Sequence, residues 1–171
     1  MGEEATMGLE LVAGRIVGKN MPTGHPHGII KLNIGAALRQ YAREHKSGQV
    51  IVGKVGIYTR RQPDQIRGAD VIYISKERYA QRQSQSFLDV APEIVVEVRS
   101  PDDTWRRFNQ KLREYFEIGV RHVWVVDPEV KSVVIYRSFI DFQEYTEVDT
   151  LTAEHILPSF SLRISDIFED L

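Results

Sequence analysis

Apolar residues recur at helical spacing in two stretches of the chain. The first stretch predicts a helix from about Ile30 to Gly48, with one apolar face formed by Ile30, Ile34, Ala37, Leu38 and Tyr41. The second has its apolar stripe at Trp105, Phe108, Leu112, Tyr115 and Phe116, all of which we expect in the core. Asp102, Asp103 or Thr104 can cap this second helix, and Gly119 suits its left-handed C-terminal residue.

Between and after these helices the pattern becomes typical of strands. The predicted strands are 49–60, 71–74, 93–99, 121–126 and 131–136, with an edge strand at 142–145. Residues 9–17 read as a helix end or strand, a turn at Gly14 and a further strand, whereas 76–89 reads as a loop or short surface helix. The order helix, strands, helix, strands predicts an α/β (α+β) protein with a mixed sheet.

The composition is that of an ordinary soluble globular protein. The 171 residues, 42% hydrophobic and 27% charged, suffice for one domain spanning 1–171. A net charge of -2 argues against broad electrostatic clamping of nucleic acid but leaves room for a local basic patch. The absence of cysteine excludes thiol catalysis and cysteine-ligated metals. No run is apolar enough to cross a membrane, so we expect a cytoplasmic protein with no membrane partner.

Charged residues interrupt the predicted strand 93–99. Because side chains alternate along a strand, Glu97 and Arg99 share one face and emerge together near its C-terminal end. Asp70 begins the short strand 71–74, and if the two strands pair, Asp70 and Glu97 can converge. Two carboxylates suit Mg²⁺, which keeps several waters and takes one or two carboxylates plus phosphate oxygens. An ion so placed can polarise a phosphodiester.

A phosphodiester site also needs a cation near the developing negative charge. Arg99 is adjacent, but an always-protonated guanidinium is a poor proton acceptor. Lys111 lies at the margin of the second apolar stripe, where a long side chain can reach the sheet edge. The spacing alone leaves a simpler reading open, with Glu97 and Arg99 as a surface ion pair, Asp70 as a strand-start aspartate and Lys111 solvated.

At these residues the sequence resembles the Uma2 (DUF820) family, a branch of the PD-(D/E)xK restriction-endonuclease-like superfamily. The order and spacing of several short motifs carry the resemblance over nearly the whole chain. They are Glu10–Ile16, His27, Ala69-Asp70-Val71, Val96–Pro101, Lys111 with Tyr115, Gly119-Val120, Trp124–Pro128 and Leu157–Phe160.

The resemblance implies a restriction-endonuclease-like core, a mixed sheet flanked by helices. It implies Asp70 as the first acid, Glu97 as the second, and Lys111 as a motif lysine moved from the strand to the next helix. Glu10 looks like the additional acid that many such folds bring from an N-terminal segment. Two positions depart from the usual pattern: Ala69 stands where the family usually has proline, and Arg99 occupies the ordinary lysine position and is the alternative to Lys111.

These observations lead to one main hypothesis and two alternatives. The main one is a Mg²⁺-dependent endonuclease that hydrolyses DNA, with Mn²⁺ as a substitute ion. Asp70, Glu97 and the Val98 carbonyl would bind the metal, Glu10 would support it, and Arg99 would contact phosphate or brace Glu97. The same fold could instead serve as a non-catalytic module that binds nucleic acid or protein, or hydrolyse another phosphate ester. A homodimer would suit cleavage of both DNA strands, and the hairpin expected from strands 121–126 and 131–136 offers apolar edge surface together with the C-terminal segment.

Overall fold

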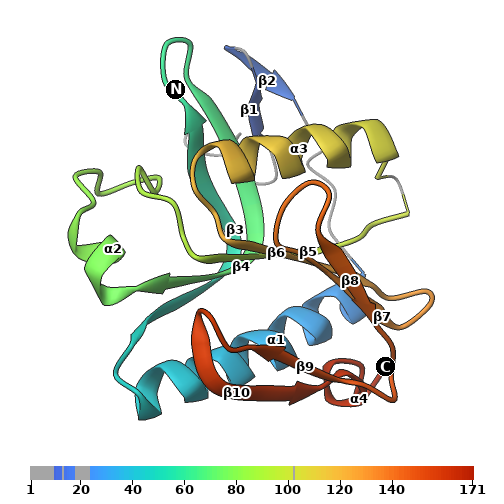
Figure 1. Ribbon diagram of the computed structural model, residues 1–171. Coiled ribbons are helices and arrows are strands. Elements are labelled where there is room, and N and C mark those ends of the chain that lie inside the picture. The colour runs from blue at the N-terminus through green and yellow to red at the C-terminus, as the bar shows by residue number, and fades with distance from the viewer. Residues whose placement is uncertain (1–9, 13, 18–23, 102) are drawn as a thin grey trace.

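Two helices, α1 (His25–Glu44) and α3 (Trp105–Glu117), cover opposite faces of an eight-stranded sheet in the computed structural model (Figure 1). The structure describes residues 10–12, 14–17, 24–101 and 103–171. The prediction of a mixed sheet flanked by helices is confirmed. No helix within these described ranges is long and apolar enough to span a membrane.

The large sheet has the strand order β2-β1-β4-β5-β6-β7-β8, with β3 paired to β4 beside this path. Its strands are β1 (Glu10–Val12), β2 (Arg15–Val17), β3 (Gly48–Arg60), β4 (Gln65–Ser75), β5 (Ile94–Val98), β6 (His122–Asp127), β7 (Ser132–Tyr136) and β8 (Phe142–Tyr145). The β5–β6 pair is parallel, as expected for strands joined through a crossover helix, here α3. The short helix α2 (Lys76–Ala80) follows β4.

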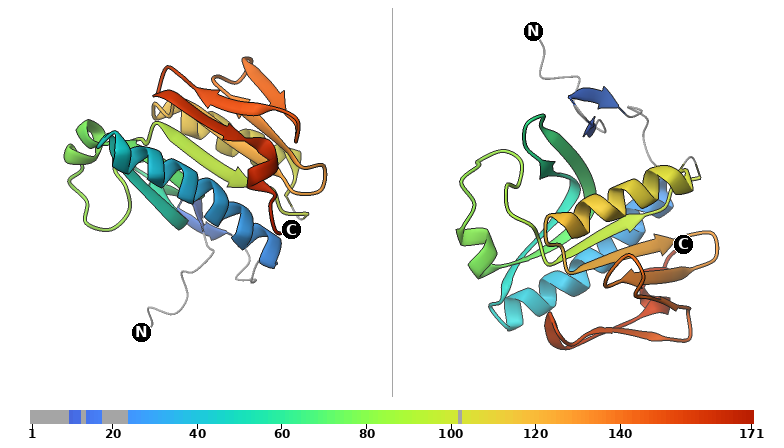
Figure 2. Two further views of the ribbon diagram at one scale, coloured as in Figure 1. Left: turned by 90° about the horizontal axis from the view of Figure 1, so that it is seen from below. Right: turned by 45° about the horizontal axis from the view of Figure 1, so that its top comes forward.

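The core has two layers, one on each face of the sheet. On one face, α1 packs with a separate hairpin, β9 (Thr150–Ala153) and β10 (Leu157–Arg163), and with α4 (Ile164–Ile167), as both views of Figure 2 show. On the other face α3 buries Leu112 and Tyr115 against Val95 and Val125. The alternation along β5 thus sends Val96 towards α1 and Val95 towards α3.

The position of β4 decides where the site lies. β3 pairs with β4 from Gln65 to Ser75 and so takes one whole edge of it. β5 pairs with residues 71–73 and β1 pairs at Ile66, so both must share the other edge, end to end. Residues 67–70 lie where these two short strands meet. Backbone groups at such a junction need partners from outside the ladder.

Three expectations about element boundaries need correction. The strand predicted at 71–74 begins at Gln65, so Asp70 lies within β4 and not at its start. The first half of β4 lacks apolar alternation and is held by pairing with β3 along one edge and with β1 at Ile66 on the other. α1 begins at His25, with Pro26 in its first turn, where the missing proline N–H costs nothing. The β9–β10 hairpin was not predicted, because neither strand shows a long alternating pattern.

The end signals of α3 are largely confirmed, whereas one core assignment is wrong. Thr104 is the N-cap and its hydroxyl accepts a hydrogen bond from the N–H of Arg107, and Gly119 has a φ of +98°. Asp102 lies outside the described residues. Trp105 was expected in the core but is 68% exposed, with its ring stacked on Phe108. Helical periodicity identifies a face, but not how far other elements cover it.

His122, the first residue of β6, predicts an acid-dependent loss of stability. Burial, with the charges of Arg137 and Arg121, lowers its pKa to about 4. Between pH 6.5, the ordinary value, and pH 4, the unfolded chain binds a proton that the folded chain does not, so stability falls as the pH falls. We expect His122→Phe to remove roughly 1–3 kcal/mol of this dependence. Urea unfolding across that range tests it, with His25→Gln as the exposed control; an unchanged slope in His122→Phe would contradict it.

Candidate active site

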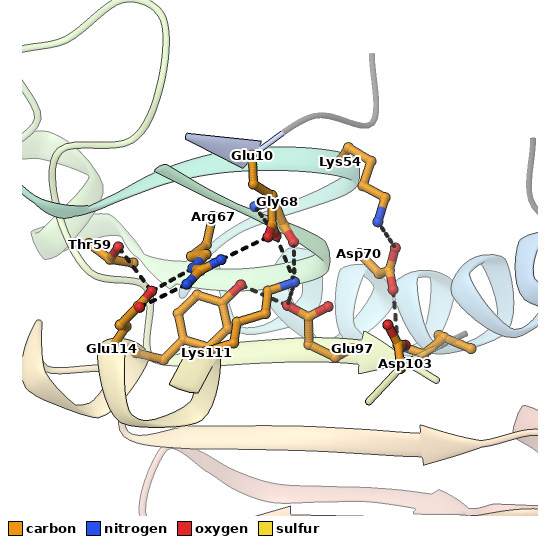
Figure 3. Close-up of polar contacts among 12 residues, drawn as sticks. Glu10, Lys54, Thr59, Arg67, Gly68, Asp70, Glu97, Asp103, Lys111 and Glu114 are labelled. Atoms are coloured by element: carbon orange, nitrogen blue, oxygen red, sulfur yellow. Dashed lines mark hydrogen bonds and ion pairs between the residues drawn. The ribbon is translucent and has the colours of Figure 1, made fainter. Parts of the chain in front are cut away.

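Lys111 lies at the centre of the junction between β1, β4 and β5. Its Nζ donates a hydrogen bond to the Gly68 carbonyl at 2.7 Å, and lies 2.8 Å from Glu97 Oε1 and 3.1 Å from Glu10 Oε1 (Figure 3). Burial opposes the charge of Lys111, but the two carboxylates outweigh burial and raise its pKa. The ammonium is therefore protonated and links three strands. It also satisfies a carbonyl at the junction described above.

Glu97 points from β5 towards α3. Its Oε1 accepts hydrogen bonds from Tyr115 Oη at 2.7 Å and from Lys111, two residues one turn apart on the helix. Among the described residues, no hydrogen bond or ion pair reaches Glu97 Oε2. Burial, together with repulsion from Asp70, raises the pKa of Glu97 despite the attraction of Lys111. A cation near Oε2 would therefore stabilise the ionised form.

Asp70 is nearly inaccessible and surrounded by positive or polar groups. Its Oδ2 accepts the backbone N–H of Val98 at 2.9 Å. His27 Nε2 lies 3.2 Å from Oδ2, and the ammonium groups of Lys31 and Lys54 lie 3.6 and 4.0 Å from Oδ1. Burial opposes ionisation, but His27, Lys54 and the Val98 N–H outweigh it and lower the pKa of Asp70 to about 2. The carboxylate is therefore charged at neutral pH.

The two acids lie on paired strands but turn towards different helices. The ladder between β4 and β5 ends at the pair Val71↔Val96, so Asp70 and Glu97 are the next residues beyond that end of the ladder. Asp70 contacts His27 and Lys31 of α1, whereas Glu97 contacts α3. Within the described ranges, no three His, Asp or Glu side chains form a preassembled cation site. The two strands that carry Asp70 and Glu97 are thus paired, as their convergence requires. Their side chains do not form a ready-made metal site within the described ranges.

Glu10 belongs to a buried ion network that includes two residues the sequence did not single out, Arg67 and Glu114. Arg67 binds both oxygens of Glu114, at 2.5 and 2.8 Å, and Glu10 Oε2 at 3.0 Å. The Gly68 N–H donates to Glu10 Oε1 at 3.2 Å. Burial opposes ionisation of Glu10, but Lys111 and Arg67 outweigh it and lower its pKa. Glu10, on β1, therefore holds Lys111 and Arg67 in position. The only sign of this ion network in the sequence is that Glu114 follows Lys111 by one helical turn.

Arg99 and Val98 each make a contact that the sequence did not suggest, while the predicted phosphate contact of Arg99 and the predicted role of the Val98 carbonyl stay predictions. Arg99 is half-exposed and pairs with Asp127 Oδ2 at 2.5 Å; no contact with Glu97 is found among the described residues. Val98 uses its N–H to hold Asp70, whereas the sequence had assigned a role to its carbonyl. Of the two cations considered for the motif role, Lys111 is the one that contacts the second acid.

Arg67 gives a prediction for stability alone. Removing one partner of a buried ion pair leaves an uncompensated charge and costs about 3–5 kcal/mol. We expect Arg67→Met to destabilise the fold by this amount, because Glu10 and Glu114 lose their shared cation. Chemical unfolding measures the loss. Arg61→Met, which removes an exposed pair with Asp64, should cost less than about 1 kcal/mol. Equal losses in both variants would contradict this account.

The site has donor atoms that could hold a divalent ion. Asp70 Oδ1 and His27 Nε2 are buried atoms without hydrogen-bond partners among the described residues. The formal charges of the site cancel, because its four carboxylates face four cations: Asp70, Glu97, Glu10 and Glu114 against Lys31, Lys54, Arg67 and Lys111. With a divalent ion the site would carry a net positive charge, which favours a phosphodiester.

The comparisons with known proteins agree with this fold. The sequence model of the Uma2 family, described as "Putative restriction endonuclease", matches residues 3–165. A crystal structure titled as a "putative nuclease belonging to DUF820" from Anabaena variabilis ATCC 29413 has a TM-score of 0.76 at 18% identity, covering 94% of this chain and 89% of that chain. At that identity the likeness concerns the fold. A search of curated proteins gave no significant match. The chain belongs to the Uma2 family of restriction-endonuclease-like proteins.

Proposed function

We propose that this protein is an endonuclease that hydrolyses DNA phosphodiester bonds with a divalent ion, Mg²⁺ or Mn²⁺, held by Asp70 and Glu97. One observation carries the proposal most strongly. Lys111 reaches Glu97 from α3, and Asp70 and Glu97 adjoin the last pair of the β4–β5 ladder, Val71↔Val96. Two acids and a lysine from three elements thus adjoin the junction of β1, β4 and β5, in a family of restriction-endonuclease-like proteins.

Each residue of the site has its own role in this proposal. Asp70 and Glu97 would hold the ion, which when bound polarises the phosphodiester and lowers the pKa of bound water. The raised pKa of Lys111 favours a role as a fixed positive charge that orients water and stabilises the developing negative charge, and not as the proton acceptor. Tyr115 and Glu10 hold Lys111 and Glu97 in position.

Lys31 and Lys54 would contribute to phosphate binding. Both lie within 4.0 Å of Asp70 Oδ1, where they neutralise that carboxylate. An ion bound to Asp70 would take over this neutralisation and leave the ammonium groups available to phosphate oxygens. The formal charges of the free site cancel, so a bound divalent ion gives the site a net positive charge that attracts DNA. We therefore expect the metal and DNA each to bind more tightly when the other is present.

Cleavage of supercoiled plasmid tests the proposal. Nicked and linear products should appear with Mg²⁺ or Mn²⁺ and disappear with a chelator. The alternative is a module that binds nucleic acid without cutting it, and the absence of a preassembled cation cluster in the described ranges favours it. Salt-dependent DNA binding without cleavage under any divalent ion would support that alternative and contradict the proposal.

A homodimer is part of this proposal, because two sites related by a two-fold axis can cut both strands. Support comes from β8, which ends the described strand order and exposes Phe142, with Ile140 in the preceding turn. Light scattering of the full chain should give twice the monomer mass of 19.6 kDa. A monomer at the concentrations used for cleavage would contradict this part alone.

A further inference from the structure

Two neighbouring side chains each have a buried polar atom without a hydrogen-bond partner among the described residues. These atoms are His27 Nε2 and Asp70 Oδ1, and the ammonium groups of Lys31 and Lys54 lie 3.6 and 4.0 Å from Oδ1 without forming hydrogen bonds. A buried polar atom without a partner is unfavourable. A cation bound to both residues would remove this cost.

The spacing of the two side chains suits a shared ion. His27 Nε2 lies 3.2 Å from Asp70 Oδ2, yet the contact does not have the geometry of a hydrogen bond. Two ligands at right angles, each about 2.1 Å from an ion, are about 3 Å apart. Nε2 and the Asp70 carboxylate are therefore separated like neighbouring ligands of one coordination sphere. The first turn of α1 fixes the backbone from which the imidazole projects, since the main-chain N–H of His27 donates to Gly24 O.

We propose that His27 Nε2 is a ligand of the divalent ion held by Asp70, so that the site binds Mn²⁺ in preference to Mg²⁺. The inference rests on the metal site of the proposed function and adds a nitrogen ligand from α1 to its carboxylates. Imidazole binds first-row transition ions well, whereas Mg²⁺ prefers oxygen ligands and keeps its waters. The imidazole of His27 therefore determines which divalent ion is preferred, while the carboxylates provide the negative charge that attracts it.

Binding of Mn²⁺ alone to the full chain tests this inference without measuring cleavage. We expect pulsed electron paramagnetic resonance of the Mn²⁺ complex to show coupling to an imidazole nitrogen. His27→Gln should lose that coupling and bind Mn²⁺ about 10- to 100-fold more weakly, with Mg²⁺ affinity changed less than about threefold. His25→Gln, an exposed histidine two residues earlier in the same helix, should leave both readouts unchanged.

The outcomes separate this inference from the proposed function. Mn²⁺ binding that is lost in Asp70→Asn, but shows no nitrogen coupling in the unmodified chain, would overturn the role of His27 and leave the carboxylate site intact. Mn²⁺ binding that is unchanged in Asp70→Asn would overturn both. The spectrum of the unmodified chain decides the matter even if His27→Gln folds poorly, and circular dichroism identifies that case.

Discussion

Lys111→Met is expected to lower both the stability of the protein and its cleavage rate. In the folded chain the ammonium is shared by Glu97, Glu10 and the Gly68 carbonyl. Methionine has nearly the same length but leaves two buried carboxylates without this partner, at a cost of about 3–5 kcal/mol. It also removes the fixed positive charge beside the second acid, which should lower the cleavage rate about 100- to 1000-fold.

The pH dependence of this loss provides a second test. Without Lys111, burial would raise the pKa of Glu97 further above its unfolded value. A carboxyl group with a raised folded pKa stabilises the fold below its unfolded pKa and loses that stabilisation as the pH rises. The variant should therefore be closer to the unmodified protein in unfolding free energy near pH 5 than near pH 8. A loss independent of pH would contradict the assignment of this charge network.

Two matched variants separate the roles of Lys111. Arg107→Met removes an exposed cation one turn earlier in α3 and should leave the free energy of unfolding nearly unchanged. Arg99→Met removes the alternative motif cation, which pairs with Asp127. We expect its cleavage rate to stay within about tenfold of the unmodified enzyme, as for a contact outside the reacting centre. A larger loss from Arg99→Met than from Lys111→Met would assign the catalytic cation to Arg99.

Asp70→Asn is expected to lower metal-dependent cleavage strongly, with a smaller effect on stability. The amide can still accept the Val98 N–H, but it lacks the charge that holds the ion. The cleavage rate should fall by roughly two to three orders of magnitude. Because the pKa of Asp70 is lowered to about 2, its charge stabilises the fold by on the order of 2 kcal/mol.

The stability contributed by Asp70 has a defined pH window. A carboxylate with a lowered folded pKa contributes above its unfolded pKa of 3.8, and this contribution is lost as the pH falls towards 2. Asp70→Asn should lack that portion of the acid sensitivity. Asp103→Asn, an exposed carboxylate before α3, serves as the control and should keep both cleavage and the acid sensitivity. Unaltered cleavage by Asp70→Asn would remove Asp70 from the metal site.

Local patterns in the sequence were sufficient to single out the residues of the second acid and its lysine. The alternation along β5 separates Glu97 from Val96 and Val98, and the helical period puts Lys111 beside Tyr115. In the structure, both α3 side chains reach the same oxygen of Glu97. This geometry depends on a helix packing directly on the strand that precedes it, which is a short-range relation along the chain.

The partners of Asp70 and Glu10 could not be predicted in this way. Arg67 meets Glu10 only because β1 and β5 share one edge of β4, and no local period encodes that arrangement. Likewise, His27 and Lys31 lie one turn apart on α1, but only the packing of α1 on the sheet brings them to Asp70. Trp105 shows the converse error, since a correct helical face was extended beyond its actual cover.

A crystal structure with bound Mn²⁺ would locate the metal itself, because the anomalous signal identifies the ion independently of activity. We expect one strong site between the strands, with Asp70 and Glu97 oxygens at about 2.2 Å from the ion and Lys111 still bound to Glu97. An ion coordinated by neither carboxylate, in crystals of a protein that cleaves DNA with the same ion, would contradict this expectation.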